Sequence, residues 1–134
     1  MENRIGRLRR RSEFLRVTEK GQKSPQKGVV VQARRCHAAD KHSDPDADLW
    51  LGITVSKKVG KAVARNRARR RLRSAAQDIL PRIAAKKHDY VLIGRVATLS
   101  RPYSDLLLDL EIALQRLGVS TGKKKSVSQV PKDH

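Results

Sequence analysis

Hydrophobic and polar residues follow two different periods along this 134-residue chain. Alternating or β-branched apolar runs predict three strands, and apolar residues spaced three or four apart predict three helices. The strands are expected at residues 28–35, 49–56 and 88–96. The helices are expected at residues 12–19, 64–80 (ended by Pro81) and 103–117.

The central strand–helix–strand unit, residues 49–96, indicates an α/β fold in which helices pack on a small sheet. Its two strands should be parallel if they are neighbours, and the general rule favours a right-handed crossover. Ser12 and Ser104 are the expected N-caps of the first and last helices. The chain then divides into an irregular basic arm, one domain and a flexible basic tail, at residues 1–11, 12–118 and 119–134.

The long central helix has two unlike faces. Its inward stripe is small and apolar, with Ala64, Ala68, Leu72, Ala75 and Ile79. Six arginines and no acid lie between residues 65 and 73. Like charges this close repel, so a folded domain keeps them where a polyanion offsets the repulsion. Since guanidinium groups fit phosphates bidentately, nucleic acid is the predicted partner.

Composition supports the same partner. The formal net charge is +18, from 31 Lys and Arg against 13 Asp and Glu, as in nucleic-acid-binding domains. The single cysteine, Cys36, excludes a disulfide framework. No apolar run approaches the roughly 18 residues that span a bilayer, and the N-terminus lacks the apolar core of a secretory signal. A cytoplasmic protein is expected, with no membrane contact and no obligate protein partner.

The sequence shows no catalytic constellation. None of the four histidines has HExxH spacing, and no nucleophile-elbow motif is present. Asp105 and Asp109 lie one helical turn apart and could hold Mg²⁺ beside RNA, but they are expected on the solvent face of the last helix. No catalytic residue is therefore assigned to the protein.

An acidic segment at residues 36–48 interrupts the basic chain and is expected to be a loop facing away from RNA. Its residue types would allow a metal site, drawn from Cys36, His37, His42 and Asp44. An irregular acidic loop explains the same residues without an ion, so no metal ligand is assigned.

The stretch LGITVSKKVGKAVARNRARRRLR, residues 51–73, closely resembles the signature of the protein subunit of bacterial ribonuclease P. Its core is the RNR motif, here Arg65, Asn66 and Arg67, preceded by VSKKVG. The similarity extends to RLRRRSEFLRV upstream and HDYVLIGR downstream, and covers roughly residues 7–117.

This resemblance implies an α+β sandwich with a small, mostly antiparallel sheet and a left-handed βαβ crossover, which would override the right-handed default. It also implies a non-catalytic protein subunit of an endoribonuclease that removes the 5′ leader of precursor tRNA. The partners would be precursor tRNA and a catalytic RNA subunit that uses Mg²⁺, with no cofactor bound by the protein alone.

The resemblance also implies two sets of RNA-binding residues. Those expected to bind the catalytic RNA are Arg65, Asn66, Arg67, Arg69, Arg70 and Arg73. Those expected to bind the leader, in a cleft between the first helix and the sheet, are Arg10, Phe14, Thr54, Ser56, Lys57 and Lys58. Thr18 and Gln32 stand where the family commonly has aromatic residues, and Lys61 where it often has asparagine. The cleft should therefore depend more on charge and less on stacking than in other members.

Two observations taken from the residues alone leave alternatives open. Phe14 could stack on a base or could pack the first helix onto the sheet. The basic charge also fits a ribosomal or RNA-chaperone protein, although that class does not share the RNR signature. A self-sufficient nuclease would need an acid, base or metal constellation, and a helix-turn-helix DNA-binding protein would need a short paired helix before the basic one.

Overall fold

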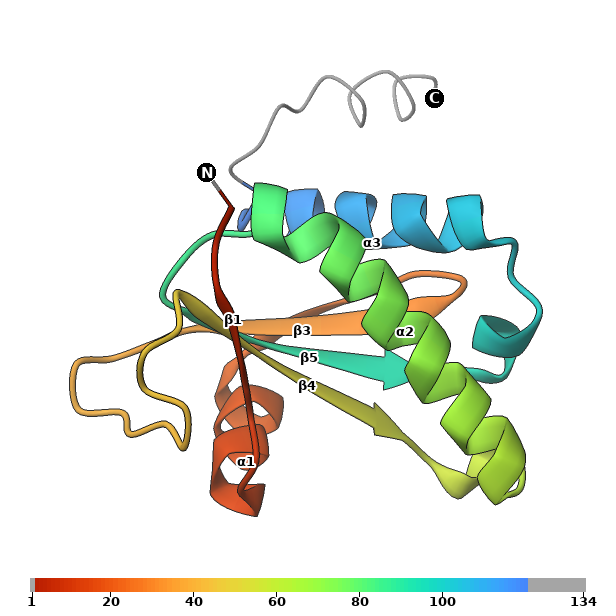
Figure 1. The fold of residues 1–134 in the computed structure, drawn as a ribbon, viewed down its shortest axis with the longest axis horizontal. Coiled ribbons are helices and arrows are strands. Elements are labelled where there is room, and N and C mark those ends of the chain that lie inside the picture. Colours follow the sequence, from red (N-terminus) through yellow and green to blue (C-terminus); the bar gives the residue numbers. More distant parts are fainter. Residues whose placement is uncertain (1, 121–134) are drawn as a thin grey trace.

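The computed structural model describes residues 2–120, which form a five-stranded sheet with helices on both faces (Figure 1). The strands are β1 (Ile5–Arg7), β2 (Gln22–Pro25), β3 (Val29–Arg35), β4 (Leu49–Val55) and β5 (His88–Gly94). The helices are α1 (Arg11–Lys20), α2 (Ala62–Ile83) and α3 (Tyr103–Arg116), with short 3₁₀ helices η1 (Lys57–Val59) and η2 (Val96–Leu99). The expected α/β class is confirmed.

The sheet has the strand order β1-β4-β5-β3-β2 and is mixed rather than mostly antiparallel. β4 runs parallel to both β1 and β5, whereas β3 is antiparallel to β5 and β2. The expectation of a mostly antiparallel sheet is wrong because two parallel pairings sit beside two antiparallel ones. β4 and β5 are neighbours joined through α2, so their predicted parallel pairing is confirmed, and the hand of the crossover stays a prediction.

The N-terminal segment is not an irregular arm. Residues Ile5–Arg7 pair with Leu49–Leu51 of β4 and extend the sheet by one strand. The pairing is anchored at both ends: Leu8 N donates to Leu51 O at 3.0 Å and Asp48 N donates to Arg4 O at 2.8 Å. At the other edge, the expected turn at residues 24–25 belongs to strand β2.

Three helix ends differ from expectation. Arg10, not Ser12, is the N-cap of α1, because the Glu13 carboxylate reaches back and accepts from the backbone N–H of Arg10 at 2.7 Å. Pro102, not Ser104, precedes the first turn of α3. Helix α2 runs through Pro81 to Ile83, since a proline in the last turn removes only one backbone donor.

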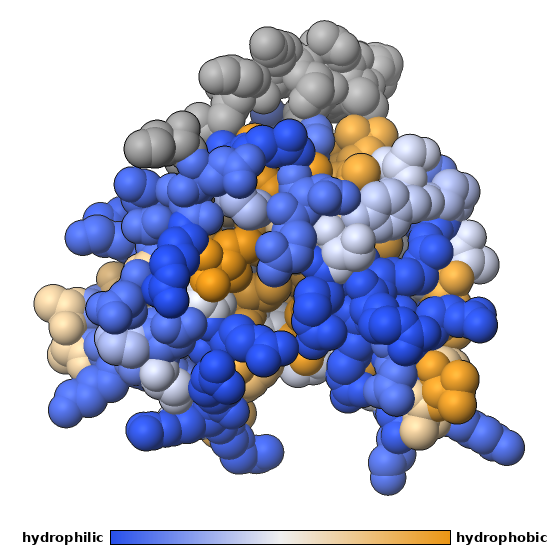
Figure 2. All heavy atoms as spheres, in the orientation of Figure 1, coloured by the Kyte–Doolittle hydropathy of each residue, from blue (hydrophilic) through white to orange (hydrophobic). Residues whose placement is uncertain are grey.

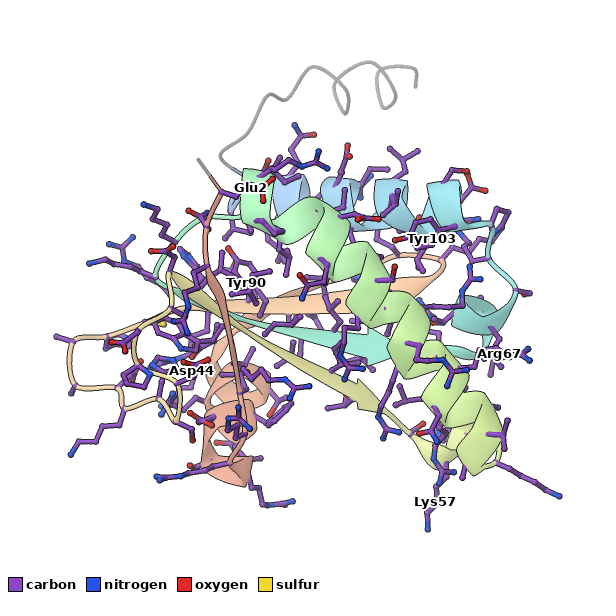
Figure 3. The ribbon with its side chains drawn as sticks, viewed as in Figure 1. Glu2, Asp44, Lys57, Arg67, Tyr90 and Tyr103 are labelled. Atoms are coloured by element: carbon purple, nitrogen blue, oxygen red, sulfur yellow. The ribbon has the colours of Figure 1, made fainter. Side chains whose placement is uncertain are left out.

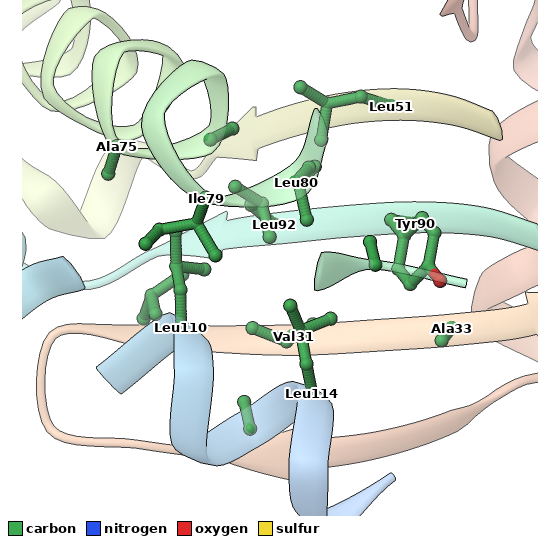
Figure 4. Close-up of a cluster of buried hydrophobic side chains, with 14 of the residues drawn as sticks. Val31, Ala33, Leu51, Ala75, Ile79, Leu80, Tyr90, Leu92, Leu110 and Leu114 are labelled. Atoms are coloured by element: carbon green, nitrogen blue, oxygen red, sulfur yellow. The ribbon is translucent and has the colours of Figure 1, made fainter. Parts of the chain in front are cut away.

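The main core lies between the sheet and the helices α2 and α3 (Figure 4). The predicted inward stripe of α2 is buried from Ala68 onward, and Ala64 is half-buried. Ala75 and Ala76 let α2 approach the strands closely, while Leu72 and Leu92 fill the space between them. Each fully buried leucine stabilises the fold by about 1.5–3 kcal/mol, so this layer fixes the position of the basic helix.

The opposite face of the sheet is only partly covered, by α1 and the residues just before it. Leu8, Val17, Trp50 and Val91 form a second buried cluster there, and Phe14 packs against its rim. Trp50 thus covers the second face of the sheet. No helix within residues 2–120 has both the length and the apolar character needed to cross a membrane.

The last two described residues contact the fold. Val119 is buried in the main core, and its carbonyl accepts from the backbone N–H of Ala85 at 2.7 Å. Ser120 forms an isolated bridge with Ala84. The remainder of the expected basic tail, residues 121–134, lies outside the described residues.

Candidate nucleic-acid interface

The arginines of α2 fall into two groups. Arg65 and Arg71 are tied to the fold: Arg65 Nη1 donates to Gly60 O at 2.8 Å, and Arg71 Nη2 donates to the carbonyl of Arg101. The other four, Arg67, Arg69, Arg70 and Arg73, lie on the outer face, where Arg69 is half-buried and the others are exposed. Figure 3 shows Arg67 pointing away from the body of the molecule. Arg65, which is expected to bind RNA, therefore also makes a hydrogen bond that braces the fold.

Asn66 is exposed beside these arginines. Its Oδ1 accepts from Arg69 Nη1 at 3.3 Å, so the side chain orients a guanidinium instead of satisfying a backbone group. A hydrogen bond of this kind restricts the rotamers of a long side chain before any ligand arrives. Asn66 and Arg69, both expected to bind the catalytic RNA, are therefore joined by a hydrogen bond.

The turn before α2 adds charge to the same end of the molecule. Lys57 and Lys58 are exposed on η1, whose N-cap is Ser56 with its Oγ accepting from Lys58 N at 3.3 Å. Gly60 has φ +147°, and a Cβ there would lie 2.9 Å from Ala64 Cβ, so the turn requires glycine. No acid lies in the first turn of α2 and Lys61 gives no side-chain cap. The positive end of the helix dipole therefore adds to the lysines.

A groove of about 610 Å³ lies between the N-terminal strand and α2, where β1 stops pairing with β4 at Leu51 and leaves the rest of that edge of β4 unpaired. We call it the β4-edge groove; it is lined by Ile5, Gly6, Arg7, Leu8, Arg9, Phe14, Leu51, Gly52, Ile53, Arg69, Arg73 and Gln77. Figure 2 shows this face, on which hydrophilic side chains surround a central hollow with apolar residues at its floor. Four arginines and no carboxylate line the groove, so it favours an anionic chain.

Phe14 sits where α1 meets the groove. A Cβ on Gly52 would lie 2.7 Å from the ring carbon Cζ of Phe14, so the ring rests directly on the backbone of β4. Phe14 is half-buried, which leaves part of the ring exposed in the groove. Both open interpretations of this residue are therefore compatible: it packs α1 onto the sheet and still offers an aromatic surface.

Thr54 continues the face on which Phe14 lies. The register places Thr54 beside Ile93, and Ile93 beside Val30, and all three are half-buried. Side chains alternate along a strand, so Thr54 and Gly52 point to the same side of the sheet. Arg10 is exposed at the start of α1. The expected leader-binding residues thus extend from α1 across this face to η1.

Comparisons with known proteins agree with one another. The family model described as ribonuclease P matches residues 3–118. The ribonuclease P protein component of Paramagnetospirillum magneticum is 48% identical over 118 residues, covering 88% of this chain and 86% of the relative. That of Ruegeria pomeroyi is 46% identical over 114 residues, covering 84% and 86%. The chain belongs to the ribonuclease P protein family.

Solved structures of ribonuclease P proteins share the fold. The Staphylococcus aureus protein at 2.0 Å superposes with a TM-score of 0.65 at 26% identity, covering 84% of this chain and 95% of that one. The Thermotoga maritima protein has a TM-score of 0.65 at 28% identity, covering 82% and 96%. The ribosomal, chaperone and DNA-binding alternatives are set aside by these matches.

Arg7, Arg9 and Gln77 line the groove of this ribonuclease P protein but are not among the predicted site residues. The two arginines reach it because β1 joins the sheet beside β4. A three-residue strand gives too short an alternation to be detected from the sequence. The cluster of arginines around Leu8 is the one signal that could have indicated them.

Asp109 is not on the solvent face of α3. It is buried, its Oδ2 accepts from the Gly28 N–H at 3.0 Å, and both its oxygens accept from Arg101, at 2.9 and 3.0 Å. The hydrogen bond with Asp109 raises the pKa of Arg101. Asp105 lies 4.0 Å from the same guanidinium, so neither carboxylate is arranged to hold Mg²⁺.

The acidic loop lies at the end of the sheet opposite to the start of α2 (Figure 1). Asp40 Oδ2 accepts from Arg34 Nη1 at 2.7 Å and from the His37 N–H at 2.8 Å. Burial opposes ionisation of Asp40, but these hydrogen bonds outweigh it and lower its pKa to about 2. The loop therefore neutralises nearby arginines of the fold, unlike the region around α2.

Proposed function

We propose that this protein component of ribonuclease P, which processes the 5′ end of precursor tRNA, positions two RNA molecules with adjoining surfaces. The outer face of α2 docks on the catalytic RNA through Asn66 and the exposed arginines. The β4-edge groove and the Phe14–Thr54 face hold the 5′ leader. One observation carries this proposal: the groove has four arginines, one aromatic ring and no carboxylate, and two of those arginines belong to α2.

The proposed division of work gives the chemistry to RNA. Asp109, the buried carboxylate of α3, is already paired with Arg101, and the groove has no oxygen ligand from an acidic side chain. We therefore expect phosphates of the RNA to hold the Mg²⁺ that the reaction uses. The reaction is proposed to take place in the cytoplasm. The protein neutralises phosphate repulsion and orients the substrate.

Single-stranded leader is the RNA form that the groove suits best. A strand with unstacked bases can place phosphates on Arg7 and Arg9 while one base lies on the exposed part of Phe14. A double-stranded RNA helix is far wider than a single strand and would not enter a groove of about 610 Å³. The mature tRNA has no leader and should not make these contacts.

The test compares precursor and mature tRNA bound to the reconstituted holoenzyme. Phe14→Ala should weaken precursor binding by about 1 kcal/mol, or roughly fivefold, and leave mature tRNA unchanged. Tyr103→Ala removes another partly exposed aromatic ring, on α3, and serves as the matched control. An equal decrease for both tRNAs would remove Phe14 from the leader site.

A second measurement tests the larger proposal. At limiting Mg²⁺, adding the protein to its catalytic RNA should raise the rate of precursor cleavage. Cleavage by rigorously RNA-free protein, or no effect of the protein on the catalytic RNA, would contradict the proposed division of work.

A further inference from the structure

Three side chains that can bind metal ions meet at the loop end of the sheet, away from the RNA-binding surfaces. Cys36 follows β3, His42 lies in the acidic loop, and Asp89 is the second residue of β5. Their ligand atoms all lie within 4.8 Å of one another. Cys36 Sγ is 3.4 Å from Asp89 Oδ1 and 3.9 Å from His42 Nε2, which is itself 2.6 Å from Asp89 Oδ1.

We propose that Cys36, His42 and Asp89 bind one Zn²⁺ ion, with water as the fourth ligand. Thiolate, imidazole and carboxylate are the three protein ligands that zinc prefers, and three of them with one water make a tetrahedral site. This departs from the expectation that the chain holds no metal. The set also differs from the one drawn on the sequence, because Asp89 from β5 joins Cys36 and His42 while His37 and Asp44 do not.

The spacing of the three atoms is close to what zinc requires. Bond lengths of about 2.0–2.3 Å in a tetrahedron place pairs of ligand atoms about 3.3–3.5 Å apart. The Cys36–Asp89 distance of 3.4 Å already satisfies this, and the Cys36–His42 distance of 3.9 Å is slightly long. The short His42–Asp89 separation must widen by about 0.7 Å, which a loop residue such as His42 can accommodate.

Asp89 supplies the independent sign that the cluster is built for a ligand. Its side chain is fully buried, and Oδ2 accepts no hydrogen bond among the described residues. The guanidiniums of Arg16 and Arg34 face Oδ2 at 3.8 Å, which is within ion-pair range but too long for a hydrogen bond. A buried carboxylate oxygen without a hydrogen bond is costly, and direct or water-mediated coordination would satisfy it.

The imidazole of His42 is oriented for this role by a stacking contact, which does not fix its distance from Asp89. It stacks on the indole of Trp50 with ring centroids 3.6 Å apart and an angle of 11° between the planes. Trp50 is in turn fixed, because its Nε1 donates to Asp44 O at 2.6 Å. The stack leaves Nε2 facing Asp89 Oδ1 at 2.6 Å, a hydrogen bond that a bound ion would replace with two metal–ligand bonds.

An ion can reach the cluster from solvent. A cavity of about 740 Å³ opens beside it and is lined by Cys36, Asp40, His42 and Trp50, among others. The cavity also has room for the water ligand. Bound zinc would fasten the acidic loop, which provides two ligands, to strand β5, which provides the third, so its role is structural and independent of the proposed RNA binding.

The full-length, EDTA-treated protein titrated with Zn²⁺ provides the test. Calorimetry should show one ion per chain, and Zn²⁺ should raise the thermal unfolding midpoint. Replacing zinc with Co²⁺ should give a sulfur-to-cobalt charge-transfer band, which can come only from Cys36 because it is the one cysteine of the chain. Cys36→Ser should abolish that band and weaken Zn²⁺ binding by about 10- to 100-fold or more.

His37→Ala is the matched control, since His37 lies next to Cys36 but outside the cluster. It should leave the stoichiometry, the band and the unfolding midpoint unchanged. A readout in the wild-type chain avoids dependence on any variant: Zn²⁺ should slow alkylation of Cys36, measured by mass spectrometry. Unchanged alkylation, no cobalt–sulfur band, or equal zinc affinity in Cys36→Ser and wild type would each overturn the proposal.

Discussion

The two ends of the central sheet differ in whether their arginines are paired with carboxylates. Around α2 and the β4-edge groove, exposed arginines face solvent with no carboxylate among the residues that line the groove. At the loop end, Arg16 and Arg34 face Asp40 and Asp89 at distances of 2.7–3.9 Å. The same chain therefore pairs its arginines inside the fold at one end and leaves them available at the other.

This difference separates charges that stabilise the fold from charges that serve a partner. Unpaired like charges repel one another and destabilise the folded state. This repulsion is present at the α2 end. The loop end shows that this sequence can supply acids where a guanidinium needs one. We infer that acids are absent from the lining of the β4-edge groove because RNA phosphates take their place.

The largest effect is expected at the loop end. Asp89→Asn should lower the free energy of unfolding by about 3 kcal/mol, because two guanidiniums lose a buried counter-charge. Urea denaturation in the presence of EDTA measures this without any contribution from bound metal. RNA affinity of the folded variant should stay unchanged.

Asp46→Asn is the control for this substitution, since Asp46 is exposed in the same loop. It removes the same charge and should change stability by less than about 0.5 kcal/mol. If Asp89→Asn were equally mild, the loop end would not be a charge-paired part of the fold, and the contrast between the two ends would fail.

The next effect is expected at the α2 end and in binding. The double substitution Arg67→Ala and Arg70→Ala should weaken binding to the catalytic RNA by about 2 kcal/mol while leaving the urea midpoint nearly unchanged. The slope of log K against log salt should become shallower by about 0.7–0.9 for each phosphate that the variant no longer neutralises.

Lys27→Ala with Arg116→Ala removes the same net charge from exposed sites outside α2 and is the matched control. It should alter the salt slope much less. An equal decrease of affinity in both double variants would mean that RNA responds to overall charge, not to the face of α2.

Much of the fold could be predicted from periodicity. Helices with strong three-to-four spacing, such as α3 with Leu107, Leu110 and Leu114, and strands with long apolar runs are predicted to within a few residues. The short edge strands β1 and β2 escape prediction, because three or four residues carry little pattern and gain their order from the neighbouring strand. The predicted end of α2 is wrong because tertiary packing carries the helix through Pro81.

The candidate site was also predictable only in part. Residues on α2 follow from sequence, since one helix face can be drawn from spacing alone. Arg7 and Arg9 could not be assigned, because their position in the groove depends on a pairing between segments more than forty residues apart. The partner of Arg101 likewise required the fold, which brings Asp109 and Gly28 together.

The smallest expected effect is a pH dependence at the loop end. The pKa of Asp40 in the folded protein is about 2, below the ordinary value of 3.8, so ionised Asp40 stabilises the fold. That contribution is complete above about pH 4 and disappears as the pH falls through 2. Asp40→Asn removes it, so the difference in unfolding free energy between wild type and variant should shrink as the pH falls from about 4 to about 2. Acid titrations followed by circular dichroism measure this, with Asp46→Asn as the control that should track the wild type. A constant difference across that range would mean that Asp40 acts through its shape alone, and that the loop end does not hold its arginines by charge.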